Sequence, residues 1–431
     1  MNTAEMMEFL QSVSWLGSKP GLERIRELLH CLGNPQNELR YVHVAGTNGK
    51  GSVCSMLSSV LTQAGYTTGL YTSPHLQFYN ERIKINGTDI SDGELCEVAR
   101  QVKNCVDEMD SKPTEFEILT AMALLYFKQR CCDIVVLEVG LGGRLDATNV
   151  VPAPEVAVIT NLGLEHTDVL GDTLEKIAEE KGGIIKPGCA AVSYDSAPEA
   201  VDVLSELCKE RAVLLSRVNY ADIHLSERSL SGQQFLWKNR IKLTLPLLGD
   251  HQLHNAALAL ETIETLRGRG WAIPDESILR GLQEVRWPAR FEVLGRNPLF
   301  ILDGGHNPQC VQALTDTVKY LRPKERAVFL IGVLADKDYP KIAELTLPFA
   351  KEYICLTPNS DRALLAEELA AFLVSRGARA CACKTVYSGI RHAIDAAGKT
   401  GVVVAFGSLY LAGEVREAFF DQIGQDGGLN I

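Results

Sequence analysis

The first informative absence in this sequence concerns cysteine spacing. The chain of 431 residues contains 12 cysteines, yet no two of them are arranged as C-x-x-C. Without that spacing, the common type of zinc site and thioredoxin-like redox sites are not expected. The closest cysteines are the adjacent pair Cys131 and Cys132 and the C-x-C of Cys381 and Cys383. We therefore interpret the cysteines as reduced thiols of a cytoplasmic protein, many of them buried.

Segments typical of secreted and membrane proteins are also missing. The amino-terminal residues show no basic stretch followed by an apolar run, so we expect no signal peptide. Residues 51–80 lack Lys, Arg, Asp and Glu, but Ser, Thr, Gly, Gln and Asn interrupt their apolar residues. A membrane-spanning helix needs about 20 mostly apolar residues in succession. We expect no membrane segment in this stretch or elsewhere.

Positive charge is in deficit along the chain. Lys and Arg number 43 against 54 Asp and Glu, which gives a formal net charge of −11. This balance argues against nucleic-acid binding through bulk electrostatics, which depends on neutralising many phosphates. An anionic small molecule needs only a local cationic pocket and is not excluded. We expect small-molecule partners, no nucleic acid, no membrane, and a monomer.

Length and composition indicate a globular protein of more than one domain. Hydrophobic residues make up 46% of the chain and charged residues 23%, the profile of an ordinary globular protein. At roughly 150 residues per domain, the length predicts two or three domains. Residues 286–298 carry two prolines and a glycine and precede a new apolar run. We therefore predict one domain over residues 1–294 and a second over 295–431.

Apolar runs alternate with helix-like stretches in both halves, which indicates βαβ units and an α/β fold with largely parallel sheets. In the second half, strands are expected at 299–303, 327–334, 353–357, 381–387 and 402–406, and helices near 308–321, 339–350, 363–376, 388–397 and after 408. In the first half, strands are expected at 41–45, 133–139 and 156–160. Residues 53–64 show the spacing of an amphipathic helix, and 81–90 that of a hairpin or surface loop.

The strongest local motif is the glycine-rich loop Gly46–Ser52, between the strand at 41–45 and the helix that follows. In such loops, backbone N–H groups bind phosphate oxygens, a lysine such as Lys50 neutralises charge, and a hydroxyl such as that of Ser52 can bind Mg²⁺. The strict G-x-x-x-x-G-K-[ST] pattern is not met, because Gly51 separates Lys50 from Ser52. A glycine-rich turn is often only a turn, but strand, loop and helix together favour phosphate binding.

Polar residues also follow other predicted strands, namely Glu138, His166, and Asp303 with His306. In α/β sheets, ligands bind at the carboxyl ends of the strands. A carboxylate such as Glu138 suits a metal ion there, although pairing with a lysine is an equally simple interpretation. A single histidine such as His166 is more often structural than a ligand. For Arg290, close to the predicted boundary, the simple alternative is a structural salt bridge.

Together, these motifs resemble the folylpolyglutamate synthase family, which in bacteria is usually combined with dihydrofolate synthase. The resemblance covers nearly the whole chain in the right order. The segments that carry it are His43–Val53, Tyr71–His75, Phe78–Ile83, Thr114–Glu117, the strand that ends at Glu138, Leu145–Asn149, the segment before His166, Lys181–Lys186, Trp287–Arg290, Asp303–Pro308 and Gly407–Leu411. That family belongs with the muramyl-peptide (Mur) ligases. The resemblance therefore implies a P-loop ATPase domain with a mainly parallel sheet, followed by a smaller Rossmann-like α/β domain.

The resemblance also implies roles for individual residues. ATP contacts would come from Thr47, Asn48, Gly49, Lys50, Gly51, Ser52, Asn255, Arg290 and Asp303. Mg²⁺ ligands would be Ser52, Ser73, Glu138 and His166. Substrate contacts would come from Arg82 and Ser408, with His306 near the incoming glutamate. Lys50, Lys181 and His306 would be catalytic, and Lys181 matches a lysine that is carbamylated in the family. Ala289 departs from the glycine that is frequent at its position.

The activity that the resemblance implies is ATP-dependent ligation of L-glutamate to a folate, and also to dihydropteroate, through an acyl phosphate. A muramyl-peptide ligase is one rival, but Phe78–Ile83 and the absence of a preceding uridine-binding domain argue against it. A P-loop ATPase that ligates nothing is another. Lys181 has its own alternative, a surface lysine at the end of a helix over 173–181, where it would favour the helix dipole. Lys50 and Glu138 lie in the first half and Asp303 and His306 in the second, so we expect catalysis to need both.

Overall fold

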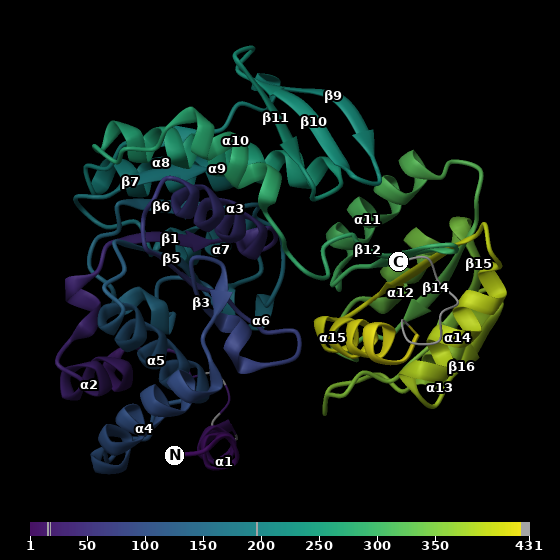
Figure 1. The fold of residues 1–431 in the computed structure, drawn as a ribbon, viewed down its shortest axis with the longest axis horizontal. Coiled ribbons are helices and arrows are strands. Elements are labelled where there is room, and N and C mark those ends of the chain that lie inside the picture. Colours follow the sequence, from purple (N-terminus) through teal and green to yellow (C-terminus); the bar gives the residue numbers. More distant parts are fainter. Residues whose placement is uncertain (15–16, 18, 195–196, 424–431) are drawn as a thin grey trace. The chain divides into compact units, whose positions relative to one another are not determined.

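The computed structural model describes residues 1–14, 17, 19–194 and 197–423, and these divide into two compact units (Figure 1). Unit 1 comprises Met1–His224, Phe235–Thr244 and Leu253–Val285. Unit 2 comprises Leu225–Gln234, Leu245–Gln252 and the described residues from Arg286 onward. The sequence-based boundary after position 294 falls inside strand β12 (Glu292–Arg296). This strand pairs with a strand of unit 2, so the structural division comes earlier along the chain.

Unit 1 is built on an eight-stranded sheet in the order β4-β3-β2-β5-β1-β6-β7-β8. Its strands are β1 (Tyr41–Ala45), β2 (Thr68–Tyr71), β3 (Ile83–Ile85), β4 (Thr88–Asp89), β5 (Ile134–Glu138), β6 (Val156–Ile159), β7 (Ala190–Ser193) and β8 (Leu215–Arg217). The run from β2 to β8 in this order is parallel. The central strands β5, β1 and β6 are buried along their whole length, as expected for a parallel sheet covered on both faces.

Helices cover both faces of this sheet (Figure 1). One face carries α1 (Thr3–Ser14), α2 (Glu23–Cys31), α4 (Asp92–Glu108) and α5 (Glu115–Gln129), and further along α7 (Leu174–Gly182) and α8 (Pro198–Glu210). The other face carries α3 (Lys50–Gln63), with α10 (Asp275–Glu284) packed against it and α9 (Asp250–Gly268) nearby. The predicted hairpin is confirmed, because Asn86 and Gly87 turn the chain from β3 to β4 with φ of 50° and 79°.

The prediction that the helix after the glycine-rich loop is amphipathic is wrong in one respect. Helix α3 buries Ser52, Ser55 and Ser58 as well as its apolar residues. The reason is that α10 covers its outer face: Ser59 Oγ donates a hydrogen bond of 2.7 Å to the carbonyl oxygen of Gly281. A Cβ atom on Gly281 would lie 2.5 Å from the Cα of α3 residue Val60, so only glycine permits this approach. The helix is therefore held rigidly behind the loop.

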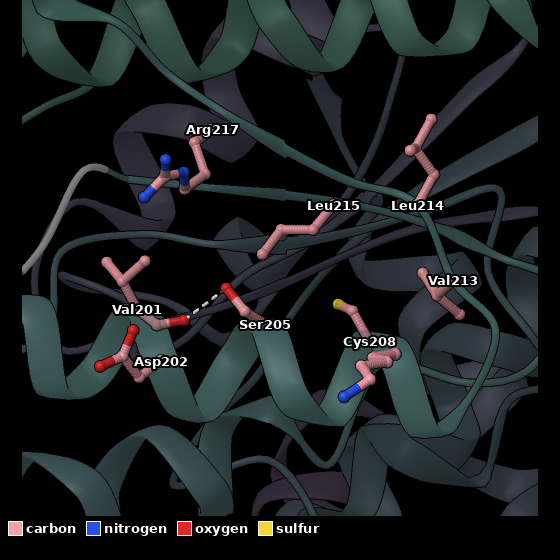
Figure 2. Close-up of a pocket in the computed structure, with 9 residues that line it drawn as sticks. Val201, Asp202, Ser205, Cys208, Val213, Leu214, Leu215 and Arg217 are labelled. Carbon is pink, nitrogen blue, oxygen red and sulfur yellow. Dashed lines mark hydrogen bonds between the residues drawn. The ribbon is translucent and has the colours of Figure 1, made fainter.

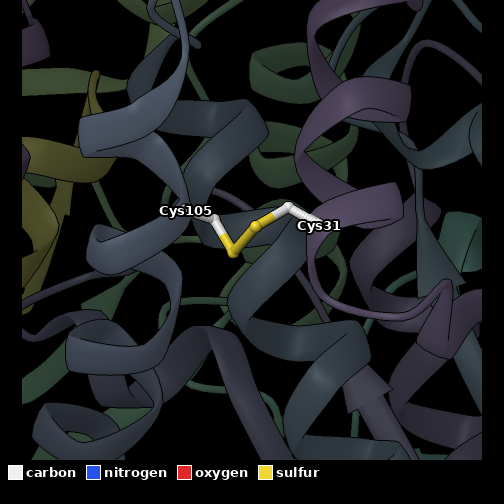
Figure 3. Close-up of a disulfide and its surroundings, with 2 residues drawn as sticks. All are labelled: Cys31 and Cys105. Carbon is white, nitrogen blue, oxygen red and sulfur yellow. A yellow bond between two sulfur atoms is a disulfide. The ribbon is translucent and has the colours of Figure 1, made fainter.

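A disulfide between Cys31 and Cys105 joins α2 to α4 (Figure 3). The interpretation of all cysteines as free thiols is thus wrong for these two. Their sequence separation of 74 conceals the pairing, which arises because α2 packs against α4 and α5 in the hydrophobic cluster below the sheet. The other ten cysteines are free, and six of them are buried.

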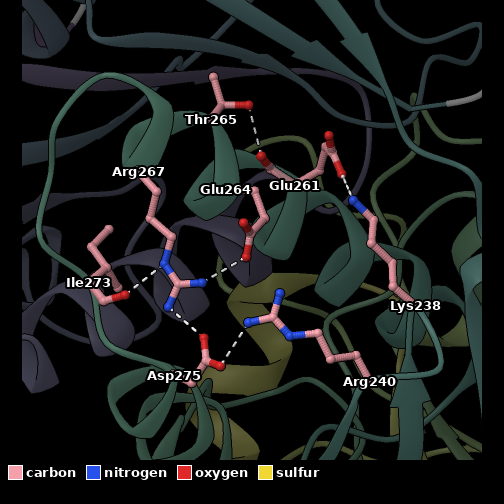
Figure 4. A network of polar contacts seen from close by, with 8 residues as sticks. All are labelled: Lys238, Arg240, Glu261, Glu264, Thr265, Arg267, Ile273 and Asp275. Atoms are coloured by element: carbon pink, nitrogen blue, oxygen red, sulfur yellow. Dashed lines mark hydrogen bonds and ion pairs between the residues drawn. The ribbon is translucent and has the colours of Figure 1, made fainter.

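A three-stranded sheet in the order β11-β10-β9, which the sequence did not reveal, contributes residues to both units. Its strands are β9 (Ile223–Ser229), β10 (Gly232–Trp237) and β11 (Ile241–Leu245). In unit 1, polar side chains tie the turn between β10 and β11 to α9 and α10 (Figure 4). Arg240 and Arg267 both donate to Asp275, and Lys238 pairs with Glu261 at 2.9 Å. Each pair has at least one exposed partner, namely Lys238, Arg240 or Asp275, so solvent screens the charges and each pair contributes only a fraction of a kcal/mol.

Unit 2 holds a six-stranded sheet in the order β12-β13-β17-β14-β15-β16. Strand β12 is antiparallel to β13 (Leu299–Leu302), and β17 (Val402–Phe406), β14 (Ala327–Ile331), β15 (Ala350–Cys355) and β16 (Ala380–Ala382) are parallel. On one face, α11 (Pro308–Leu321), α12 (Tyr339–Thr346) and α13 (Ala366–Ser375) share a hydrophobic cluster with the sheet. On the other lie α14 (Val386–Ala397) and α15 (Leu409–Ala418). The predicted second-half α/β domain is confirmed.

Two predicted strands of unit 2 are clearly too long. The strand expected at 327–334 ends at Ile331, where β14 ends. Residues 381–387 were expected to be extended, but β16 ends at Ala382 and α14 begins at Val386. Thr385 Oγ1 accepts the backbone N–H of Ser388 at 3.1 Å and so caps the helix. Among the helices of the described residues, none is long and apolar enough to cross a membrane.

Candidate functional site

The predicted phosphate loop lies between β1 and α3, and the segment that follows β6 holds it in place. Thr47 donates its backbone N–H to the Asn161 carbonyl oxygen at 2.8 Å. Thr160 Oγ1 donates to the Asn48 carbonyl oxygen, also at 2.8 Å. Asn48 and Asn161 form an isolated β-bridge. The loop is therefore a rigid extension of the central strands. Thr160 and Asn161 lie in the segment before His166, but the sequence analysis gave neither residue a role of its own.

Two glycines of the loop are required by close approaches. A Cβ atom on Gly46 would lie 1.7 Å from Thr160 Oγ1. A Cβ atom on Gly49, whose φ is 89°, would lie 2.4 Å from Asn255 Oδ1. Asn255 belongs to α9, is only 3% exposed, and accepts a hydrogen bond from the hydroxyl of Tyr194. Helix α9 thus places Asn255 directly against the loop. The sequence analysis assigned Gly49 and Asn255 to the same ligand, ATP, and that assignment requires the two residues to be close.

Lys50 is the first residue of α3, and its side chain lies against the glycine-rich loop. Its Nζ donates to the carbonyl oxygens of Gly46 at 3.0 Å and Thr47 at 3.2 Å, so it folds back over the loop. Lys50 is half-buried in the first turn of α3. Ser52, in the same turn, is 3% exposed. The amino terminus of a helix carries partial positive charge and unpaired N–H groups, which favours an anion at this point.

Ser73 and Glu138 meet at the carboxyl ends of β2 and β5. The backbone N–H of Ser73 donates to Glu138 Oε2 at 3.0 Å, and the Glu138 side chain is buried, with 4% exposed. Because β2, β5 and β1 are adjacent and parallel, this pair lies at the same sheet edge as the loop. The charges of Glu138 and Lys50 both act on the pKa of the buried Cys54 thiol, Glu138 raising it and Lys50 lowering it, on top of a larger increase from burial.

His166, the remaining candidate metal ligand, differs from the others. It lies in the long connection after β6, directly before the short helix α6 (Thr167–Leu170), and its side chain is exposed. Its backbone adopts φ of 52°, in the left-handed region that is uncommon for residues other than glycine. Ser52 and Glu138 are buried at their strand and helix ends, whereas His166 is on a surface segment. Its assignment stays a prediction.

Lys181 is buried beside the loop and is not the surface lysine of the simpler alternative. It lies near the end of α7, has 4% of its surface exposed, and donates from Nζ to the Gly46 carbonyl oxygen at 2.9 Å. Burial, followed by the charge of Lys50, lowers the pKa of Lys181 to about 7. The end of α7 is placed by the loop after β5, where a Cβ on Gly143 would lie 2.8 Å from the Glu180 carbonyl oxygen.

A buried polar network centred on Asp146 supports the loop that follows β5. Asp146 accepts the backbone N–H groups of Leu141 at 2.9 Å and Thr148 at 3.0 Å, and the Thr148 hydroxyl also bonds to it. Thr148 Oγ1 lies 2.9 Å from Nε2 of His43, in the middle of β1. Burial and the charge of Lys186 lower the pKa of His43 to about 3. His43 is therefore neutral at physiological pH and has a structural role.

Arg82 contacts two aromatic residues whose roles the sequence did not indicate. Its Nε donates to His75 Nδ1 at 2.8 Å, and its guanidinium carbon lies 5.7 Å from the centre of the Tyr79 ring. Burial, followed by the charge of Arg82, lowers the pKa of His75 to about 4. His75 is then a neutral acceptor that orients Arg82. Both residues lie in the quoted segments Tyr71–His75 and Phe78–Ile83, whose spacing alone does not show this contact.

In unit 2, Asp303 follows β13 and is held by backbone groups. Its Oδ1 accepts the N–H of Gly305 at 2.7 Å and its Oδ2 that of Phe291 at 2.8 Å. Burial raises the pKa of Asp303, while the positive charge of Arg290 opposes that shift. The turn that carries Arg290 has left-handed backbone at Ala289, with φ of 54°. This explains why glycine, which adopts such angles without strain, is frequent there in the resembling family.

His306 and Ser408 are also fixed by local contacts in unit 2. His306 Nδ1 lies 3.0 Å from the Gly304 carbonyl oxygen, and since a carbonyl only accepts, Nδ1 is the donor. Ser408 is 2% exposed, and its Oγ accepts the N–H of Leu411 at 3.0 Å as the cap of α15. Gly407 donates its N–H to the Gly305 carbonyl oxygen at 3.0 Å, which places the loops after β13 and β17 side by side. Asp303, His306 and Ser408 therefore share one edge of the unit 2 sheet.

A cavity of about 400 Å³ opens elsewhere in unit 1, between α8 and β8 (Figure 2). It contains none of the predicted site residues. Ser205 Oγ at its wall donates to the Val201 carbonyl oxygen at 2.7 Å within α8. The lining residues are Val201, Asp202, Ser205, Cys208, Lys209, Val213, Leu214, Leu215 and Arg217. Strands β6 and β7 lie between β8 and β1, the strand that leads to the phosphate loop, so we assign the cavity no part in the site described above.

The close approach at Gly49 yields a test with a matched control. Gly49 and Gly65 flank α3 with φ of 89° and 92°, but a Cβ on Gly65 would meet nothing within 4 Å. Alanine at Gly65 should lower the free energy of unfolding by about 1–2 kcal/mol, the cost of left-handed backbone. Alanine at Gly49 should cost about 1–3 kcal/mol more, because it also displaces Asn255. Denaturant unfolding of the two variants measures the difference, and equal costs would contradict the contact.

Comparisons with known proteins agree with the resemblance seen in the sequence. The family described as Mur ligase middle domain matches residues 44–263, and the Mur ligase glutamate ligase domain matches residues 289–409. The chain is 37% identical over 412 residues to the dihydrofolate synthase/folylpolyglutamate synthase of Bacillus subtilis (strain 168), covering 93% of this chain and 95% of that one. It is 38% identical over 377 residues to the folylpolyglutamate synthase of Lacticaseibacillus casei, covering 84% and 87%.

Solved structures show the same likeness. Mycobacterium tuberculosis folylpolyglutamate synthase complexed with ADP and AMPPCP matches with a TM-score of 0.88 at 32% identity, covering 96% of this chain and 98% of that one. The Escherichia coli FolC protein in complex with DHPP and ADP matches with a TM-score of 0.85 at 32% identity, covering 97% and 98%. The match extends over both units.

Proposed function

Because the chain belongs to the family of folylpolyglutamate and dihydrofolate synthases, with the domains of the Mur ligases, we propose that the loop Gly46–Ser52 binds the phosphates of ATP. The protein is an ATP-dependent ligase that joins L-glutamate to a folate. One observation carries the proposed site above all others: Lys50, the first residue of α3, folds back over the loop and donates to the carbonyl oxygens of Gly46 and Thr47. A lysine on a glycine-rich loop at the amino end of a buried helix favours a bound polyanion.

The contacts around the loop suit a magnesium ion as well. Mg²⁺ prefers oxygen ligands. Ser52 and Ser73 offer hydroxyl oxygens, and Glu138 offers a buried carboxylate that the N–H of Ser73 holds at this edge of the sheet. We therefore propose that Ser52 binds a first Mg²⁺ beside the phosphates, and that Ser73, Glu138 and His166 are ligands of the Mg²⁺ sites. When bound, Mg²⁺ neutralises charge on the phosphoryl group that is transferred.

The proposed reaction has two steps, phosphoryl transfer and amide-bond formation. A carboxylate oxygen of the pterin substrate attacks the γ-phosphorus of ATP, ADP leaves, and an acyl phosphate forms. The α-amine of L-glutamate then attacks the carbonyl carbon, and orthophosphate leaves with the former carboxylate oxygen. Phosphoryl transfer needs mainly positioning and charge neutralisation, which we assign to Lys50 and Arg290, with Asn255 and Asp303 as further ATP contacts.

Residues of unit 2 serve the second step in this proposal. With Nδ1 donating to Gly304, a neutral His306 carries its lone pair on Nε2. This nitrogen is suited to accept a proton from the attacking amine. The Ser408 oxygen already accepts the N–H that caps α15, so we propose that Ser408 binds glutamate by donating its hydroxyl hydrogen. Arg82, oriented by His75, is proposed to contact the acidic part of the pterin substrate.

Three further proposals concern Lys181, the state of the protein and the roles of the two units. Lys181 is proposed to act as a carbamate whose oxygens lie near the metal ion. The protein is proposed to work as a monomer in the cytoplasm. Since Lys50 and Asp303 belong to different units, both units are proposed to be necessary for ligation.

Product analysis with two acceptors tests the function and its substrate range. The purified chain is incubated with ATP, Mg²⁺ and L-glutamate, together with dihydropteroate or tetrahydrofolate, and the products are identified by mass spectrometry. We expect each pterin that is accepted to gain one glutamyl residue for each ADP formed. A muramyl-peptide acceptor, included as the control for the Mur ligase rival, should give no product. Absence of glutamyl products with both pterins would contradict the proposed function.

A further inference from the structure

Unit 2 contains a cluster of metal-ligating side chains that plays no part in the ligase reaction. It consists of Cys381 and Cys383, at and just after β16, and His392 of α14. All three are at least partly exposed, and their ligand atoms lie within 4.8 Å of one another. The sequence alone argued against zinc here because the cysteines form C-x-C and not C-x-x-C. The histidine that completes the set becomes visible only in the fold.

The secondary structure explains why these three side chains meet. Successive side chains of a strand alternate between faces, so residues two apart point to the same side. Cys381 pairs with Ile354 of β15, while Tyr353 and Cys355 belong to the cluster under α11–α13 on the opposite face. Cys381 therefore points to the α14 face. Cys383 lies two residues after Cys381, and its N–H still donates to the Cys355 carbonyl oxygen at 2.9 Å. The chain therefore remains extended beside β15 as far as Cys383, whose side chain points to the same face as that of Cys381.

The distances within the cluster match a tetrahedral ion. His392 Nδ1 lies 3.6 Å from Cys381 Sγ and 4.0 Å from Cys383 Sγ. Tetrahedral zinc with Zn–S of about 2.3 Å and Zn–N of about 2.0–2.1 Å separates sulfur from nitrogen by about 3.6 Å. We propose that Cys381, Cys383 and His392 bind a zinc ion. Because the cluster faces solvent, water completes the coordination, as in zinc sites with three protein ligands.

An outer carboxylate supports the same assignment. His392 Nε2 lies 3.8 Å from Glu352 Oε1, on the side of the ring away from the sulfurs. Metal-bound histidines commonly direct their second nitrogen to a carboxylate, which fixes the ring and strengthens its bond to the metal. Glu352 precedes Ile354 by two residues in β15, so it projects to the same face as Cys381. Binding the ion converts both thiols to thiolates and releases their two protons to solvent.

The zinc site is separate from the candidate ligase residues of unit 2. Strand β16 is an edge of the sheet, and β17, β14 and β15 lie between it and β13, which leads to Asp303. At about 4.8 Å for each strand spacing, β16 is about 19 Å from β13. Substitutions in the cluster should therefore leave the rate of glutamate ligation unchanged, which also verifies that the variants fold.

Cobalt binding to the full chain tests the proposal. After reduction, the protein is titrated with Co²⁺ in excess Mg²⁺, and thiolate-to-cobalt charge transfer is followed in the near ultraviolet. We expect one equivalent of Co²⁺ to give this band, and one equivalent of Zn²⁺ to abolish it. Cys383→Ser should lose the band, and Cys131→Ser, which removes an exposed free thiol in unit 1, should keep it. Glu352→Gln should weaken binding about 10- to 100-fold.

Two results would overturn the zinc site. One is a titration of the reduced wild-type protein that gives no thiolate band. The other is an identical titration for Cys383→Ser and Cys131→Ser in variants that retain wild-type ligation. Neither result bears on the ligase site, because the charge-transfer band requires thiolate ligands and the proposed magnesium ligands include none.

Discussion

Replacing Lys50 with alanine should lower the rate of glutamate-dependent ADP formation by about 100- to 1,000-fold. The ammonium group is the cation that the loop itself supplies, and it lies over the carbonyl oxygens of Gly46 and Thr47. In the transition state of phosphoryl transfer, charge develops on the phosphoryl oxygens, and a fixed cation stabilises it. The measurement is the steady-state rate of ADP formation with pterin and glutamate present.

The control for Lys50 is a lysine of the same unit without a proposed role. Lys176 of α7 is exposed and pairs with Asp172 at 2.8 Å. Lys176→Ala should have the wild-type rate, because an exposed ion pair contributes little to stability and nothing to the loop. Circular dichroism of Lys50→Ala should show the native fold. A folded Lys50→Ala protein with the wild-type rate would show that the loop does not bind the transferred phosphate.

The second large effect is expected at Lys181. Lys181→Ala should lose nearly all ligation, about 100-fold or more, as when a fixed charge is removed from a transition state. A carbamate forms from CO₂ and the neutral amine, and burial beside Lys50 lowers the pKa of Lys181 to about 7, so the neutral amine is abundant at pH 7–8. Carbamate formation should decline as pH falls below about 7, where the ammonium form prevails. NMR of protein equilibrated with ¹³C-labelled bicarbonate detects the carbamate carbon directly.

Chemical rescue distinguishes a carbamate from a merely buried lysine. Short carboxylates such as acetate should restore part of the activity of Lys181→Ala, because they replace the lost oxygens. Lys186 is the matched control: burial also lowers its pKa, to about 8, but its Nζ donates to the Asn149 carbonyl oxygen at 2.9 Å. Any loss in Lys186→Ala should not be rescued. Full activity of Lys181→Ala, with no carbamate signal in the wild-type protein, would contradict the assignment.

The sequence predicted those parts of the fold that local patterns determine. Strands β1 and β17 and helix α11 have the predicted bounds, because continuous apolar runs and a Pro308 start are strong local signals. The loop between β1 and α3 follows from its glycines. Their necessity is visible only in three dimensions, where Gly46 meets Thr160 and Gly49 meets Asn255.

The features that the sequence did not reveal depend on contacts between distant segments. The Cys31–Cys105 disulfide and the cluster of Cys381, Cys383 and His392 arise from helix packing and strand pairing. The burial of Lys181 arises from the loop after β5, which receives the end of α7. Single-sequence patterns contain none of these long-range contacts.

The rival in which the loop belongs to an ATPase without ligation makes a different prediction for the substrate carboxylate. In the reaction proposed here, that carboxylate gives one oxygen to the phosphate group in every turnover. A non-ligating ATPase would transfer the phosphoryl group to water. The fate of the oxygen therefore separates the two functions in a way that ADP formation alone does not.

The most direct test follows this oxygen. The pterin acceptor is labelled with ¹⁸O in the carboxylate that receives glutamate, and the orthophosphate formed with ATP and L-glutamate is analysed by mass spectrometry. We predict one ¹⁸O atom in the orthophosphate for each glutamyl product, because the acyl phosphate loses its phosphate together with that oxygen. Orthophosphate without ¹⁸O, formed alongside the glutamyl product, would contradict carboxylate activation by ATP at this site.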